Sequence, residues 1–91
     1  MDIQQIIKQG NCTIVDVRTR SEFQNGHAPG SVNIPLQEVP VKLTELKAMK
    51  QPLMLCCASG GRSGQAHAWL ADQGIDCHNV GSWVNVRHHL S

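Results

Sequence analysis

The chain has 91 residues and a formal net charge of +1, which indicates one small domain with a balanced surface charge. A balanced charge does not favour a dedicated nucleic-acid or polyanion binder. No stretch approaches the roughly 18 consecutive apolar residues that span a membrane. We therefore expect a single domain over residues 1–91, with neither nucleic acid nor a membrane as its partner.

The first residues, 1–5, lack the basic end and the apolar run of a signal peptide. If Met1 is the natural start, this predicts a cytoplasmic protein, in which the four cysteines stay reduced. Cys56 and Cys57 are adjacent, and a disulfide between neighbours has a strained geometry. Cys12 and Cys77 are interpreted as structural, so any reactive thiol is sought at the adjacent pair.

The predicted elements alternate between helix and strand from the N-terminus onward. Residues 3–9 place isoleucines on one helical face, with Asp2 as a possible N-cap and Gly10 as a stop. The β-branched run 13–17 predicts a strand, and residues 32–34 predict a second, shorter one.

Apolar residues between 36 and 49 recur at helical spacing, which predicts a helix with Pro40 in its first turn. Proline is tolerated there because the first turn does not need its missing N–H group. The rest of the chain predicts four more elements: a buried strand at 53–56, a helix at 63–73, a strand at 77–80 and a helix at 83–89.

Alternating strands and helices predict an α/β fold, with a small central parallel sheet of four to five strands and helices on both faces. Ligands of such sheets bind beyond the carboxyl ends of the strands. The residues that leave the strand at 53–56 are therefore the first place to look for chemistry.

A cysteine-bearing, glycine-containing loop follows that strand and leads into a helix. It consists of Cys57, Ala58, Ser59, Gly60, Gly61, Arg62 and Ser63. The two glycines permit a tight turn whose amides point at one centre, and the following helix adds its positive end. Such surroundings lower the pKa of a cysteine and stabilise a thiolate. The loop is suited to a nucleophile that attacks anionic sulfur or phosphorus compounds, although a buried structural cysteine beside a plain turn remains an alternative.

The loop resembles the active-site loop of the rhodanese family, Cys-x-x-Gly-x-Arg-Ser, at residues 57–63. A second stretch, 14–35, is similar to the family's N-terminal signature, with its Asp-Val-Arg, Glu-Phe and Gly-His-Ala-Pro-Gly segments. Residues 81–83, Gly-Ser-Trp, weakly match a Gly-Gly-Trp of the family. The matched blocks extend from about Thr13 to Trp83.

This resemblance implies the rhodanese fold and a two-step sulfur transfer without a cofactor or a metal. Cys57 would take a sulfane sulfur from a small anionic donor such as thiosulfate and pass it to a thiol, cyanide or protein acceptor. The substrate-binding residues implied are Ala58, Ser59, Gly60, Gly61, Arg62 and Ser63, with backbone amides around the persulfide and Arg62 as electrostatic support.

The resemblance also suggests structural roles for several residues of the N-terminal signature. Asp16, Arg18, Glu22 and His27 fall in this group. Arg18 and Glu22 are spaced so that they could pair, and His27 lies in a Pro-Gly turn.

Two residues depart from the family pattern. Ala58 occupies a position where thiosulfate-using members often have arginine, which argues against thiosulfate as the physiological donor. Cys56 precedes the nucleophile where an aromatic residue is common. It is interpreted as a buried strand residue, with a role in resolving the persulfide as an alternative.

Other readings of the same loop stay open. Counted from Cys56, five residues separate a cysteine from Arg62, which is the spacing of cysteine phosphatases and arsenate reductases. The glycine at position 60 favours the register that starts at Cys57, and no general acid is evident. A non-catalytic interaction module and a piece of a larger protein are further alternatives. The pair His88-His89 is interpreted as a solvated tail rather than a metal site.

Overall fold

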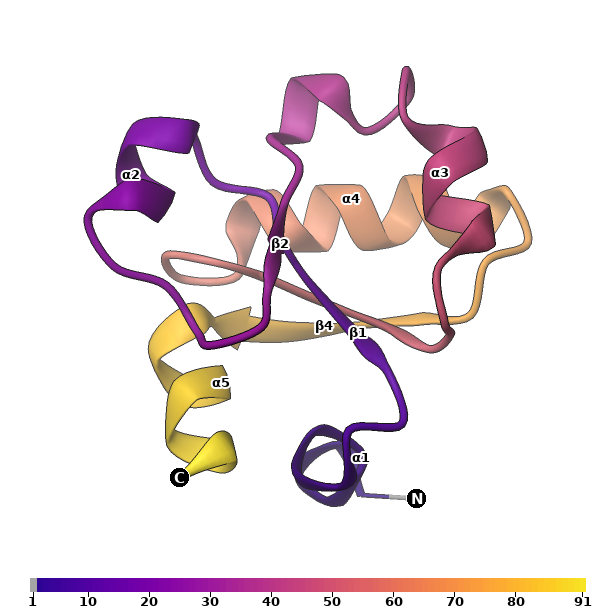
Figure 1. The fold of residues 1–91 in the computed structure, drawn as a ribbon. Helices are drawn as coiled ribbons and strands as arrows, with labels where there is room; N and C mark the ends of the chain where they lie inside the picture. The colour runs from indigo at the N-terminus through magenta and orange to yellow at the C-terminus, as the bar shows by residue number, and fades with distance from the viewer. Residues whose placement is uncertain (1) are drawn as a thin grey trace.

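The computed structural model describes residues 2–91, so Met1, on which the predicted start depends, lies outside the described residues. The elements in chain order are α1 (Ile3–Gln9), β1 (Thr13–Asp16), α2 (Arg20–Gln24), β2 (Val32–Asn33), η1 (Leu36–Glu38), α3 (Leu43–Ala48), β3 (Leu53–Cys57), α4 (Gly61–Asp72), β4 (Cys77–Ser82) and α5 (Trp83–Leu90). Helices and strands alternate along the chain (Figure 1), as predicted except for α2.

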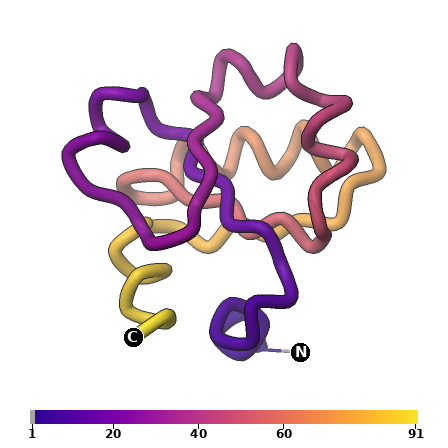
Figure 2. Tube along the Cα trace, viewed as in Figure 1, coloured from indigo at the N-terminus to yellow at the C-terminus, as the bar shows by residue number. Residues whose placement is uncertain are grey.

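The four strands form one parallel sheet in the order β2-β1-β3-β4. The helices lie on both of its faces: α3 and α4 cover one, and α1 and α5 cover the other (Figure 1). Both terminal helices therefore pack on the same face, where the chain begins and ends (Figure 2). The predicted α/β class, the parallel sheet and the covering of both faces are confirmed.

Strand β3 is central and buried along its whole length, from Leu53 to Cys57. Because side chains alternate across a strand, its residues divide between two apolar clusters. Leu53, Leu55 and Cys57 join the cluster under α3 and α4, and Met54 and Cys56 join the cluster under α1 and α5. This alternation sends the two adjacent cysteines to opposite faces of the sheet.

The predicted cap of α1 is present. The Gln4 amide donates to the carboxylate of Asp2 at 3.1 Å, and the helix ends at Gly10 with a left-handed φ of 74°. The capped helix buries Ile6 and Ile7 beneath the sheet. No helix among residues 2–91 is long and apolar enough to cross a membrane.

The single helix predicted over residues 36–49 is wrong. The chain forms the short 3-10 helix η1, turns at Pro40, and starts again as α3. Proline lacks the N–H that would bond to the carbonyl of Leu36, so the helix cannot run through. Val39 instead donates its amide to Leu36 at 3.2 Å, which ends the first segment.

Helix α2 has no counterpart among the predicted elements. Its start is a capping box: Thr19 accepts from the amide of Glu22 at 3.2 Å, and Glu22 accepts from the amide of Thr19 at 3.1 Å. The pattern Thr-x-x-Glu was present in the sequence and signals a helix start. The helix has no buried residues, so its sequence lacks the helical repeat of apolar residues from which the other helices were predicted.

Candidate active site

The predicted loop connects the carboxyl end of β3 to the amino end of α4. Cys57 is the last residue of the strand, and Gly60 precedes the helix with a φ of 106°. This left-handed conformation favours glycine. A Cβ atom at position 60 would also lie 3.3 Å from the Cα atom of Gly81, so the loop packs closely against the end of β4.

The loop directs several hydrogen bonds at the sulfur of Cys57. The amide of Gly60 donates at 3.0 Å and the amide of Ser63 at 3.5 Å, while the Ser63 hydroxyl lies 3.3 Å away. Cys57 is 1% exposed and Ser63 is fully buried. The sulfur therefore occupies a nest of donors that substitutes for water.

These donors lower the pKa of Cys57 despite its burial. Burial raises the pKa of the thiol, but the hydroxyl and amide of Ser63 and the amides of Gly60 and Ser59 outweigh it, so the pKa falls to about 7. A substantial fraction of Cys57 is then thiolate at neutral pH, which is the form that acts as a nucleophile.

Cys56 has the opposite environment on the other face of the sheet. Its side chain is 0% exposed and packs among Ile14, Met54 and Val86. Burial, with the negative charge of Asp16 nearby, raises the pKa of Cys56 to about 12. The predicted buried strand position is what the structure shows, and the phosphatase register has no activated thiol at Cys56.

Arg62 does not contact the sulfur. Its guanidinium donates to both carboxylate oxygens of Glu22, at 2.6 and 3.0 Å. This bidentate contact, together with bonds from Thr19, lowers the pKa of Glu22 to about 2. The expected electrostatic support from Arg62 is therefore largely neutralised by Glu22, and the pair ties α2 to the start of α4 instead.

The expected pairing of Arg18 with Glu22 is wrong. Arg18 donates to the carboxylate of Asp16 through Nε, at 3.0 Å, and through Nη2, at 2.8 Å, and both side chains are buried. Its guanidinium also lies 4.7 Å from the ring centroid of Trp83. It reaches Glu22 only through the backbone carbonyl, at 3.4 Å. Arg18 therefore pairs with the buried Asp16, two residues before it, and not with the side chain of Glu22, four residues after it.

His27 makes local contacts. Its Nδ1 atom donates to the carbonyl of Phe23 at 2.7 Å, and its ring stacks on the Phe23 ring with centroids 3.8 Å apart. These contacts agree with the structural role expected for it. The predicted turn at Pro29-Gly30 is present, closed by the amide of Ser31 donating to the carbonyl of Ala28 at 3.1 Å, and Ala28 is buried in the cluster under α1 and α5.

The other loop residues differ in what they contribute. Ala58, Ser59 and Gly61 are exposed and form the outer rim above Cys57. Within residues 2–91, neither Ala58 nor Gly61 donates a hydrogen bond to the sulfur. The rim is therefore uncharged, apart from the Arg62 guanidinium that Glu22 already holds.

Asn79 on β4 belongs to the site, although the sequence did not single it out. Its carboxamide accepts from the hydroxyl of Ser63 at 2.7 Å and donates to the carbonyl of Gly60 at 3.1 Å. The available signal was general: polar residues at the carboxyl ends of neighbouring parallel strands converge.

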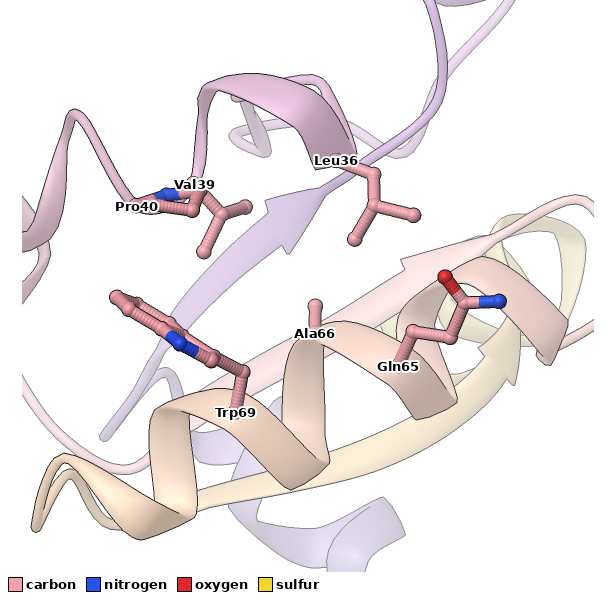
Figure 3. A pocket seen from close by; sticks show the side chains of 6 residues that line it. All are labelled: Leu36, Val39, Pro40, Gln65, Ala66 and Trp69. Carbon is pink, nitrogen blue, oxygen red and sulfur yellow. The ribbon is translucent and has the colours of Figure 1, made fainter.

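A hollow of about 180 Å³ lies between η1 and α4 (Figure 3). Trp69 and Ala66 face Leu36 and Val39 across it. Its lining contains no residue of the loop 57–63, so it is distinct from the cysteine nest.

No group of three His, Cys, Asp or Glu side chains in the described part of the chain is arranged to hold a metal ion. Cys12 and Cys77, which were interpreted as structural, donate through sulfur to backbone carbonyls at 3.8 Å. Burial raises the pKa of each of these thiols. Cys57 is thus the cysteine of the chain whose pKa is lowered.

The chain is similar in sequence and in fold to known proteins. A sulfurtransferase of Allochromatium vinosum is 31% identical over 71 residues, which are 78% of this chain and 65% of that protein. A thiosulfate sulfurtransferase of Escherichia coli is 34% identical over 61 residues, 66% of this chain and 59% of that protein. The chain thus spans about three fifths of the length of these two relatives.

A solved structure, a rhodanese-related protein of Thermoplasma volcanium, superimposes with a TM-score of 0.80 at 29% identity, over 96% of this chain and 84% of that one. The family model described as "Rhodanese-like domain" matches residues 2–88. The chain therefore belongs to the rhodanese-like domain family.

Proposed function

We propose that the protein is a sulfurtransferase that carries a sulfane sulfur as a persulfide on Cys57. The observation that supports this most directly is the nest of donors around a cysteine whose pKa is about 7. The same donors suit the terminal sulfur of a persulfide, because it is also an anion and lies one S–S bond, about 2.0 Å, beyond Sγ. Relatives named as sulfurtransferases agree with this chemistry.

The reaction proceeds in two displacements at sulfur. The Cys57 thiolate attacks the sulfane sulfur of the donor, forming a new S–S bond, and the donor's own S–S bond breaks with the electron pair leaving on the departing group. For thiosulfate that group is sulfite; for a persulfide it is a thiolate. An acceptor thiolate or cyanide then attacks the outer sulfur of the Cys57 persulfide, and the electron pair returns to Cys57.

Among donors, the site favours a small persulfide over thiosulfate. Thiosulfate is a dianion, and a strong site for it needs positive charge at the rim. Here the residue after the nucleophile is Ala58, and the Arg62 guanidinium is held by both oxygens of Glu22. A persulfide donor carries less charge, and backbone amides suffice to hold it.

Intact-mass spectrometry tests this proposal. The protein is incubated with thiosulfate or with cysteine persulfide, beside Cys57→Ser and Cys56→Ser variants. We expect a mass gain of one sulfur, with persulfide more effective than thiosulfate, and loss of that gain only in Cys57→Ser. Failure to gain sulfur from either donor contradicts the proposal, and dependence on Cys56 contradicts the assignment of the nucleophile.

Cyanide then serves as a simple acceptor. The sulfur-loaded protein should return to its original mass and release thiocyanate, which shows that the sulfur is a transferable sulfane rather than an oxidised adduct. A persulfide that cyanide cannot remove, or that forms without later transfer to any thiol, would favour the non-catalytic module.

A further inference from the structure

Asn79 lies where strand β4 is irregular beside the loop. Asn79 pairs with Leu55 in the register of β3 and β4, and the next pair joins Gly81 with Cys56, so Val80 is an extra residue. Such bulges re-aim side chains and often occur next to active sites. Because Asn79 is level with Leu55, it lies on the sheet face that carries Cys57 rather than Cys56.

Two backbone groups determine the orientation of the Asn79 carboxamide. The amide of Gly81 donates to Oδ1 at 3.1 Å, and Nδ2 donates to the carbonyl of Gly60, also at 3.1 Å. The reverse orientation would place a donor against a donor and an acceptor against an acceptor. The oxygen of Asn79 must therefore be the atom that faces the hydroxyl of Ser63, at 2.7 Å.

The Ser63 hydroxyl then has two acceptors and one proton. It lies 2.7 Å from Oδ1 of Asn79 and 3.3 Å from the sulfur of Cys57. Beside a neutral thiol, the shorter bond to Asn79 is preferred, and the lone pairs of Ser63 face the sulfur. Beside a thiolate, a charge-assisted bond to sulfur is the stronger one. The hydroxyl must leave Asn79 when Cys57 ionises.

We propose that Asn79 is a positioning residue that competes with the Cys57 sulfur for the hydroxyl proton of Ser63 and so opposes formation of the thiolate. The consequence concerns reactivity, since a thiolate stabilised too far is a weak nucleophile and the best attacking thiol titrates near ambient pH. The competition keeps Cys57 ionised yet reactive. The proposal rests on the proposed function only in treating Cys57 as the nucleophile.

The charges around Cys57 are the same in the unaltered chain and in the three alanine variants used below. They belong to Arg62 of α4, its partner Glu22 of α2, and the pair Asp16 and Arg18 at the end of β1. From β4, His78 pairs in register with Met54 and so lies on the opposite face of the sheet. A change in titration on neutral substitution at position 79 therefore reports the hydrogen bonds.

A double-mutant cycle tests the competition. The pKa of Cys57 is measured from the ultraviolet absorbance of its thiolate in four proteins: the unaltered chain, Asn79→Ala, Ser63→Ala and the double variant. We expect Asn79→Ala to lower the pKa by about half a unit to one unit, the size of one hydrogen bond, when Ser63 is present. In the Ser63→Ala background we expect no change.

Other outcomes overturn the proposal. An equal change in pKa with Ser63 and with alanine at position 63 would mean that Asn79 acts by holding the loop in place. A raised or unchanged pKa of Cys57 in Asn79→Ala would exclude competition for the hydroxyl proton. If Asn79→Ala does not fold, judged by circular dichroism, Asn79→Asp replaces it. In that variant the oxygen of residue 79 remains an acceptor and becomes a stronger one. The pKa of Cys57 must then rise more when Ser63 is present than when position 63 is alanine.

The measurement is independent of sulfur transfer. Thiolate absorbance and alkylation rates report the titration of Cys57 even if neither thiosulfate nor a persulfide loads the protein. If the proposed function is wrong, the protein gains no sulfur, while the double-mutant cycle still gives the expected pKa changes of Cys57. Failure of this inference would appear as an altered cycle in a protein that still takes up sulfur.

Discussion

Two adjacent cysteines on one strand have opposite chemical environments. Cys56 faces the layer of α1 and α5, where it packs in an apolar cluster, and burial, with the charge of Asp16 nearby, raises its pKa to about 12. Cys57 faces the layer of α4, where amides and a hydroxyl are directed at its sulfur, and its pKa falls to about 7. Both residues are almost wholly inaccessible. Burial alone therefore does not decide reactivity; the donors that replace water decide it.

The contrast depends on the geometry where β3 ends. Cys57 is the last strand residue, so the chain can curl around its side chain, whereas Cys56 is still bonded within the sheet between β1 and β4. A shift of one residue would place the other sulfur in the nest. The loop length between the strand and Ser63 thus selects the nucleophile.

The largest expected effect is on selective alkylation. With limiting iodoacetamide at neutral pH, we expect Cys57 to react more than about a thousandfold faster than Cys56, because the reagent consumes thiolate. The rate should rise with pH around a midpoint of about 7. Peptide mapping by mass spectrometry identifies the modified residue, and Cys56→Ala serves as the control that keeps the fast phase. Fast modification of Cys56, or a midpoint near that of an unperturbed thiol, contradicts the comparison.

A second effect concerns the buried ion pair of Asp16 and Arg18, which lies next to Cys56 because Asp16 pairs with Cys56 across β1 and β3. Arg18→Met removes the cation that pairs with the buried Asp16 and leaves it the backbone amide of residue 18, at 3.0 Å. We expect a loss of about 3–5 kcal/mol in the free energy of unfolding. Arg20→Met is the matched control, since Arg20 contacts Glu38 at 2.6 Å on the exposed surface and should cost at most about 1 kcal/mol. Urea unfolding followed by tryptophan fluorescence measures both. Equal losses in the two variants would show that burial of the pair carries no special weight.

The smallest effect sharpens the role of the loop arginine. In Glu22→Gln the neighbouring negative charge is removed and Arg62 is released toward the rim. We expect loading of Cys57 by thiosulfate to become about two- to fivefold faster, in line with the modest strength of exposed ion pairs. The gain should diminish in high salt. Glu45→Gln, which breaks the surface contact of Glu45 with Lys42, is the control. Slower loading in Glu22→Gln would show instead that Arg62 must be held by Glu22 for the site to form.

Patterns local in sequence predicted most of the fold. A β-branched run marked β1, an apolar run marked β3, and Asp2 and Gly10 marked the first helix. Where one signal was given too much weight the prediction failed: apolar spacing between 36 and 49 concealed the break at Pro40. Where the hydrophobic period was absent, as in α2, the helix was missed even though a capping box was present.

The sequence alone determined that a strand runs into a glycine-containing loop with a cysteine at its start, and that this loop resembles the rhodanese family. Those features are contiguous in the sequence. Glycine backbone freedom and the alternation of side chains along a strand therefore predict them without knowledge of the rest of the fold. The partners of the loop residues were decided only by the tertiary structure. Glu22 reaches Arg62 across 40 residues and Asn79 reaches Ser63 across 16. Such contacts depend on which strands become neighbours and on a bulge in one of them, and spacing along the chain carries no record of either.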